Sequence, residues 1–102
     1  MTLSITHNAA ASRFETAPQG LHAECSYRRQ GQLLDINHTE VPAALQGQGV
    51  AAALVQAALD WARSEGLRVR PTCSYVASYM SRHPATQDLL ESAGAARAAR
   101  AT

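Results

Sequence analysis

Two glycines separated by one residue, Gly47 and Gly49, stand directly before an alanine-rich run in the stretch LQGQGVAAAL. Glycine in an ordered segment costs roughly 0.5–1 kcal/mol relative to alanine, so such a pair indicates positive φ angles or a close backbone approach. The run that follows, Val50 to Glu65, has apolar residues at helical spacing. Because the first turn of a helix leaves N–H groups without partners, the sequence predicts an anion site at this loop. An ordinary turn that starts the helix is the competing interpretation.

Alternating apolar and polar residues before this helix predict a series of half-buried strands. The predicted strands are Leu3 to Thr6, Arg13 to Ala17, Leu21 to Arg28 and Leu33 to Val41. The sequence RQGQ at 29–32 predicts a hairpin turn between the last two. In the last strand, Leu34, Ile36 and His38 are expected on one face. We expect these strands to form a run of antiparallel pairs.

The segments after the helix predict one further strand and more helix. Gly66 is placed to end the helix in a left-handed cap. The next strand, Leu67 to Thr72, must pair through a crossover, which makes that pair parallel. A helix is expected over Ser74 to Arg82, ending before Pro84, and a short one over Thr86 to Ser92. The predicted fold is α/β, with a mixed, mostly antiparallel sheet, one strand–helix–strand parallel crossover and a C-terminal helix.

Length and charge limit the classes of protein to consider. The 102 residues predict a single domain over 1–92, followed by an Ala/Arg-rich tail over 93–102. Nine basic residues, all arginine, against eight acidic ones are spread along the chain, which argues against a nucleic-acid partner. No apolar run approaches the roughly 18 residues of a membrane span, and the N-terminus lacks a signal peptide. We therefore expect no membrane partner and a cytoplasmic location.

The two cysteines, Cys25 and Cys73, lie far apart without CxxC spacing, and the four histidines are scattered. We expect reduced thiols and no metal site. Cys73, in PTCSYV, follows a predicted strand and stands at the start of a helix, where a helix N-terminus stabilises the thiolate. The alternative is a small buried apolar group, which is also the expectation for Cys25 within its strand.

Two other phosphate-binding motifs compete for the glycine loop. Gly47, Gly49 and Ala52 satisfy the dinucleotide fingerprint GxGxxA. However, the glycines follow several residues after the strand, the next strand carries Val69 and Arg70 near its end in place of an acidic residue, and the chain holds a single such unit. A Walker loop is excluded because the GK[ST] ending is missing.

The block HTEVPAALQGQGVAAALVQAALDWARSEGLRVRPTCSYV, followed by YMSRHP, resembles the minimal, single-domain branch of the GNAT-type N-acetyltransferase superfamily over about Ile5 to Leu90. Members carry a Q/RxxGxG/A loop that holds the coenzyme A pyrophosphate, and Gln46, Gly49 and Ala51 fill its defined positions. The resemblance implies a GNAT-like fold and acetyl-CoA as the acetyl donor. The chain is shorter than full-length members and lacks the helices that usually wall the acceptor site.

The resemblance also implies site residues. The strand from Asp35 to Val41 would offer its backbone to the pantetheine arm, while the strand Leu67 to Thr72 would separate from it and leave a slot for the thioester. Cys73 would stand beside that slot as a candidate nucleophile. The residues expected to bind coenzyme A are Val41, Gln46, Gly47, Gln48, Gly49, Val50 and Ala51.

The function expected from this resemblance is transfer of an acetyl group from acetyl-CoA to an amine. One route passes through an acetyl thioester on Cys73. In the other, the amine attacks acetyl-CoA directly while His38 or Glu40 removes its proton, directly or through water. Tyr75 and Tyr79 are candidates to protonate the leaving thiolate, although aromatic residues at helical spacing also suit a core.

Two functions from other classes remain open: a coenzyme A binding module without catalysis, and a small protein-interaction domain whose glycine loop is structural. The expected acceptor is a small-molecule or protein amine. The expected assembly is a monomer or a weak dimer.

Overall fold

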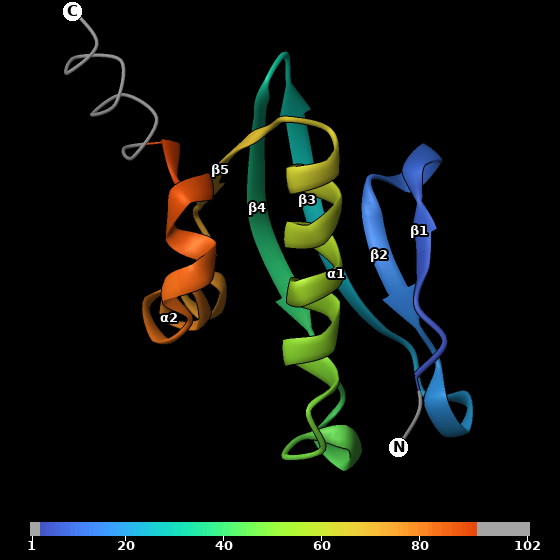
Figure 1. Ribbon diagram of the computed structural model, residues 1–102. Coiled ribbons are helices and arrows are strands. Elements are labelled where there is room, and N and C mark those ends of the chain that lie inside the picture. Colours follow the sequence, from blue (N-terminus) through green and yellow to red (C-terminus); the bar gives the residue numbers. More distant parts are fainter. Residues whose placement is uncertain (1–2, 92–102) are drawn as a thin grey trace, which may run out of the picture.

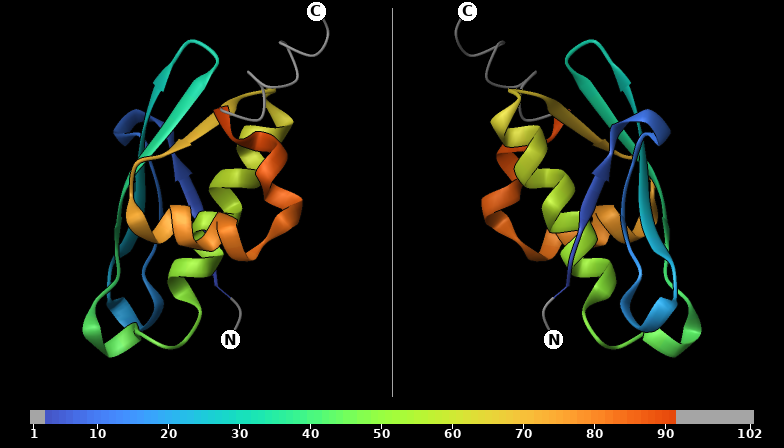
Figure 2. Two further views of the ribbon diagram at one scale, coloured as in Figure 1. Left: turned by 90° about the vertical axis from the view of Figure 1, so that its left-hand side faces the viewer. Right: turned by 90° about the vertical axis from the view of Figure 1, so that its right-hand side faces the viewer.

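A computed structural model describes residues 3–91 as one five-stranded sheet with two α-helices on one of its faces (Figures 1 and 2). The strands are β1 (Thr6–Asn8), β2 (Arg13–Thr16), β3 (Ala23–Gln30), β4 (Leu33–Glu40) and β5 (Arg68–Pro71). The helices are α1 (Val50–Ser64) and α2 (Ser74–Arg82), with 3₁₀ turns η1 (Ala9–Ala11), η2 (Pro18–Gly20), η3 (Ala43–Leu45) and η4 (Pro84–Leu89). No helix among the described residues is both long and apolar enough to cross a bilayer.

The sheet has the strand order β1-β2-β3-β4-β5, and the first four strands pair antiparallel. Strand β5 pairs with β4 in parallel, from Leu33 opposite Arg68 to Ile36 opposite Pro71. Helix α1 makes the connection between these two strands and packs on the sheet. The predicted mixed sheet, with its single strand–helix–strand crossover and C-terminal helix, is therefore confirmed.

Glycines in the left-handed region bound α1 at both ends. Gly49 precedes the first turn with a φ of 80°, and Gly66 follows the last turn with a φ of 69°. At the C-terminal end, the Leu67 N–H donates to the Ala62 carbonyl at 2.9 Å and the Gly66 N–H donates to the Arg63 carbonyl at 3.2 Å. This pair of bonds is a Schellman motif, so the predicted left-handed cap is confirmed.

A β-bulge in β4 corrects the predicted faces of that strand. Ser26 of β3 lies opposite His38, but the next residue, Tyr27, lies opposite Ile36, so Asn37 is an extra residue in β4. One extra residue reverses the alternation of side chains beyond it. Thr39 therefore shares the inner face with Ile36, and His38 lies on the outer face. The prediction that His38 shares a face with Leu34 and Ile36 is wrong.

Other boundaries differ from the predictions by a few residues. The hairpin turn is shorter than expected, because β3 runs to Gln30 and β4 begins at Leu33. Strand β1, Thr6–Asn8, overlaps the predicted Leu3–Thr6 segment only at Thr6. The expected short helix at Thr86–Ser92 is instead the 3₁₀ turn η4, which begins at Pro84. The predicted tail, 93–102, lies outside the described residues.

Four rings join the β1–β2 hairpin to β3 and α1. The His7 ring stacks on Phe14 with centroids 4.2 Å apart and meets Trp61 edge-on at 4.5 Å. Its Nε2 is 2.6 Å from the hydroxyl of Tyr27. The Arg29 guanidinium lies over the Trp61 ring, with its central carbon 5.7 Å from the ring centroid. This cluster holds the edge of the sheet against the second half of α1.

Protonation of His7 is expected to destabilise the fold. Partial burial lowers the pKa of His7, so the unfolded chain binds this proton more readily than the folded chain does. Stability therefore falls as pH drops through the unfolded histidine pKa of about 6.5. We expect the free energy of unfolding, measured by urea denaturation, to fall between about pH 7.5 and 5.5 and to fall less in a His7→Phe variant. Equal slopes in the two proteins would contradict this assignment.

Candidate functional site

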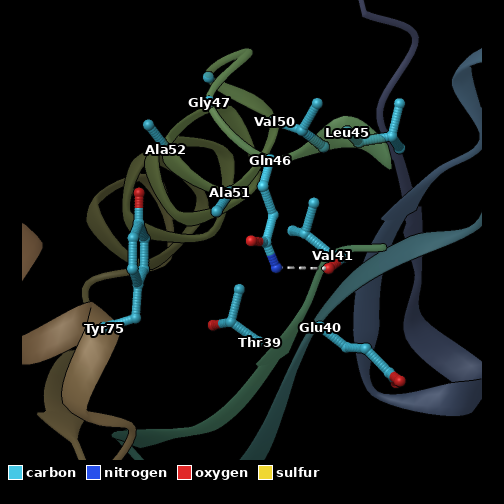
Figure 3. Close-up of a pocket in the computed structure, with 11 residues that line it drawn as sticks. Thr39, Glu40, Val41, Leu45, Gln46, Gly47, Val50, Ala51, Ala52 and Tyr75 are labelled. Carbon is cyan, nitrogen blue, oxygen red and sulfur yellow. Dashed lines mark hydrogen bonds between the residues drawn. The ribbon is translucent and has the colours of Figure 1, made fainter. Parts of the chain in front are cut away.

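A pocket of about 580 Å³ opens where β4 ends and α1 begins (Figure 3). Three elements contribute to it: the end of β4, the glycine loop with the first turn of α1, and the first turn of α2. Its lining residues are Thr39, Glu40, Val41, Leu45, Gln46, Gly47, Gly49, Val50, Ala51, Ala52 and Tyr75. The lining is mostly apolar or small, which leaves the backbone of the loop accessible from the pocket.

The glycine loop supplies backbone donors at one end of this pocket. Gly47 and Gly49 both adopt positive φ, at 81° and 80°, and a Cβ added to either would meet no atom within 4 Å. Helix α1 has no side-chain cap, and its first backbone bond runs from the Ala53 N–H to the Gly49 carbonyl at 3.0 Å. The N–H groups of the preceding first turn, on Val50 to Ala52, therefore lack intrahelical partners and suit an anion.

Core packing and hydrogen bonds within residues 41–48 hold the loop in place. Leu45 is fully buried and fixes η3 to the core. The Gln48 side-chain amide donates to the Ala44 carbonyl at 3.2 Å, and the Gln46 amide points into the pocket and donates to the Val41 carbonyl at 3.4 Å (Figure 3). All residues predicted to bind coenzyme A line the pocket except Gln48.

The two parallel strands separate beyond the pair Ile36 and Pro71, and the slot expected between them stays a prediction. The β4–β5 ladder ends at the pair Ile36 and Pro71, and one further bond runs from the Cys73 N–H to the Ile36 carbonyl at 3.0 Å. The chain then turns away into α2 at Ser74. The remainder of β4, from Asn37 onward, pairs with β3 alone and borders the pocket.

Cys73 lies where the two strands separate. It is the N-cap residue of α2 and half-buried, and its Sγ is 3.6 Å from the hydroxyl oxygen of Thr39. Partial burial raises the pKa of Cys73, but hydrogen bonds from the Thr39 hydroxyl and from the backbone N–H groups of Val76, Tyr75 and Thr39 together lower it below that of an ordinary thiol. Cys73 is outside the pocket lining, which Thr39 joins.

The second thiol has the opposite character. Cys25 is fully buried in β3, opposite Thr39. Burial raises the pKa of the Cys25 thiol to about 11. The prediction that Cys25 is a packing residue is therefore confirmed.

The two predicted bases lie together at the end of β4 but point away from Cys73. His38 and Glu40 share the outer face of the sheet, with 3.7 Å between His38 Nε2 and Glu40 Oε2 and side chains 56% and 67% exposed. Glu40 also borders the pocket, but its carboxylate turns away from it (Figure 3). Their role as proton acceptors stays a prediction. No group of three or more potential metal ligands occurs among residues 3–91.

The two tyrosines of α2 differ in their surroundings. Tyr75 lines the pocket and lies along its wall (Figure 3). Tyr79 is 5% exposed, stacks on His83 and donates its hydroxyl to Gln56. Tyr75 is thus the better placed of the two to reach a ligand, and Tyr79 is a core residue. Thr39 was not predicted as a site residue, because the bulge that turns it inward has no visible sequence signal.

The two thiols are expected to differ strongly in reactivity. A lower pKa gives more thiolate, the species that iodoacetamide alkylates. We expect Cys73 of the folded protein to be alkylated at least about tenfold faster than Cys25 near pH 7, as measured by peptide mass spectrometry. Unfolding in urea should remove the difference. Equal rates in the folded protein would contradict this description of the site.

Comparisons with known proteins agree with this architecture. Residues 13–89 match the GCN5-related N-acetyltransferase family. Protein NATD1 of Homo sapiens is 34% identical over 90 residues, covering 85% of this chain and 80% of that protein. Protein NATD1 of Xenopus tropicalis is 33% identical over 91 residues, covering 86% and 84%. The solution structure of a GCN5-like protein from Staphylococcus aureus has a TM-score of 0.70 at 28% identity, covering 86% of this chain and 87% of that one. The sequence match and the fold match both extend over most of the chain, and the glycine loop lies within them. The chain therefore belongs to the GCN5-related N-acetyltransferase (GNAT) family.

Proposed function

We propose that this protein binds acetyl-CoA and transfers its acetyl group to an amine. The observation that carries the proposal is the pocket that extends from the free N–H groups at the start of α1 to Thr39, whose hydroxyl oxygen is 3.6 Å from the Cys73 sulfur. Membership in the GNAT family supports acetyl-CoA as the donor. The glycine loop and Thr39 thus line one pocket, with the thiol behind Thr39, and this arrangement suits an extended phosphorylated thioester.

The pocket fits the donor from the phosphate end inward. The missing side chains of Gly47 and Gly49 leave room for a pyrophosphate to approach the first-turn N–H groups, which favour negative charge. The Val41 carbonyl offers an acceptor for an amide of the pantetheine arm, once the amide of Gln46 has moved from it. The part of β4 beyond Ile36, which pairs with β3 but not with β5, then directs the thioester towards Thr39 and Cys73.

In the covalent route, the Cys73 thiolate attacks the carbonyl carbon of the thioester. The carbon–sulfur bond to coenzyme A breaks, and the coenzyme A thiolate leaves and takes a proton from the phenol of Tyr75, which lines the pocket. A neutral amine then attacks the acetyl group on Cys73. The carbon–sulfur bond to Cys73 breaks and the thiolate is restored, while the amine passes one proton through water to the phenolate of Tyr75, which regains its phenol form.

In the direct route, the amine attacks acetyl-CoA itself and a base takes its proton. His38 and Glu40 face the outer side of the sheet, so a proton would have to reach them through water. The lowered pKa of Cys73 and its position beside Thr39 favour the covalent route. The acceptor, a small-molecule or protein amine, and a monomeric or weakly dimeric assembly stay part of the proposal, without a nucleic-acid or membrane partner.

A substitution in the loop tests the binding of the donor. A methyl group on Gly49 would strain a φ of 80° and occupy space in front of the N–H groups. We expect Gly49→Ala to weaken coenzyme A binding about tenfold or more, or about 1.4 kcal/mol, measured by calorimetry. Gly66→Ala is the matched control, because its φ of 69° imposes similar strain at the other end of α1. An unchanged affinity in folded Gly49→Ala would refute the phosphate-loop assignment.

The chain also offers a clean test of the covalent route, because it contains no lysine. Brief incubation with acetyl-CoA and no acceptor should add one acetyl group to the intact mass, and hydroxylamine should remove it because a thioester is labile where an amide is stable. Cys73→Ala should abolish this adduct, and Cys25→Ala should keep it.

Three further results would favour the alternatives: the direct route, a coenzyme A binding module, or a protein-interaction domain. If the wild-type protein forms no labile adduct and Cys73→Ala still acetylates amines at the wild-type rate, the direct route is favoured over the covalent one. Coenzyme A binding without turnover across an amine panel would favour a binding module. At millimolar coenzyme A, absence of a thermal shift would favour a protein-interaction domain, since ligand at 100 times its Kd stabilises by about 2.7 kcal/mol.

A further inference from the structure

We propose that Thr39 is a positioning residue, whose hydroxyl group holds the Cys73 sulfur at the wall of the pocket and stabilises it as the thiolate. The role in acetyl transfer rests on the proposed function, whereas the effect on the thiol can be measured without acetyl-CoA. Thr39 lies between the sulfur atoms of the two cysteines and also lines the pocket.

The bulge at Asn37 makes this arrangement possible. In a regular strand Thr39 would share a face with Asn37 and Asp35, because side chains alternate. The extra residue turns Thr39 to the inner face, opposite the fully buried Cys25. A hydroxyl is thereby placed among apolar core residues, at the point where the β4–β5 ladder has ended.

The hydroxyl has one proton for two sulfur atoms. Thr39 Oγ1 is 3.6 Å from Cys73 Sγ and 4.0 Å from Cys25 Sγ. Cys25 remains a neutral thiol because burial raises its pKa to about 11. A hydrogen bond to an ionised acceptor is roughly twice as strong as one between neutral groups. The Thr39 hydroxyl therefore donates its proton to a thiolate at Cys73 in preference to the more distant, neutral thiol of Cys25.

The backbone of Cys73 is already fixed, which leaves its side-chain rotation for Thr39 to determine. The Cys73 N–H donates to the Ile36 carbonyl at 3.0 Å, and the Cys73 carbonyl accepts from the Ala77 N–H at 3.1 Å. The remaining freedom is rotation about the Cα–Cβ bond. Thr39 selects the rotamer in which the sulfur lies beside the pocket wall.

A purely structural role for Thr39 makes a different prediction. Threonine is common in strands because its branched side chain suits a pleated surface, and valine serves that purpose equally well. If packing alone mattered, valine would replace threonine without effect on the thiol, and serine would be the poorer substitute. The valine and serine variants therefore distinguish the hydroxyl from the methyl group.

The test is the pH dependence of alkylation of Cys73 by iodoacetamide, followed at the Cys73 peptide by mass spectrometry. We expect Thr39→Val to raise the midpoint by about one pH unit, with a rate near pH 7 that is about tenfold lower. Thr39→Ser should retain the wild-type midpoint. Thr16→Val is the matched control, because Thr16 is a 6% exposed strand threonine whose hydroxyl donates to the Ser4 carbonyl.

The proposal is overturned if folded Thr39→Val keeps the wild-type midpoint, or if Thr39→Ser shifts it as far as valine does. Thr39→Ala, which also lacks the hydroxyl, gives the same measurement if the valine variant does not fold. The proposed function fails separately: a protein that never forms an acetyl adduct but shows the midpoint shift would retain the Thr39 assignment and lose the covalent route.

Discussion

The parallel pairing of β4 with β5 is the constraint on which the rest of the structure depends. A parallel pair needs a crossover, and α1 supplies it by returning over the sheet from the end of β4 to the start of β5. The positive end of α1 is thereby placed at the end of β4. Because β5 pairs with only the first half of β4, the second half of that strand borders an opening. For this reason the backbone N–H groups of the glycine loop lie next to the opening along the second half of β4.

Elements whose residues act locally could be predicted from the sequence. The apolar spacing of α1 and the left-handed glycine at its C-terminal end set its bounds almost to the residue. Pro84 ended α2 where expected, since proline restricts the residue before it. The crossover followed from strand, helix and strand in sequence. The pocket residues of the loop followed from the glycine spacing together with the family resemblance.

Features that depend on partners distant in sequence could not be predicted. The bulge at Asn37 arises from the register with Ser26 and Tyr27 of the neighbouring strand, and β4 alone reads as a regular alternation. The bulge residue Asn37 therefore exchanges the inner and outer side chains at the end of β4. For that reason Thr39 was absent from the site residues predicted from the sequence. Likewise, only the assembled sheet shows that Cys25 and Cys73 flank one hydroxyl and differ in their surroundings.

Both helices cover the same face of the sheet (Figure 2). The other face of β2 and β3 carries polar side chains such as Arg13, Glu15 and Glu24. These side chains are only partly exposed, but ion pairs near the surface contribute about 0–1 kcal/mol each, so the outer strand positions can change at little cost in stability. The inner positions lack that freedom because they form the core and the pocket. Substitutions can accordingly accumulate on one side of the sheet and change the partners that its surface could bind, while the core and the pocket on the other side are retained.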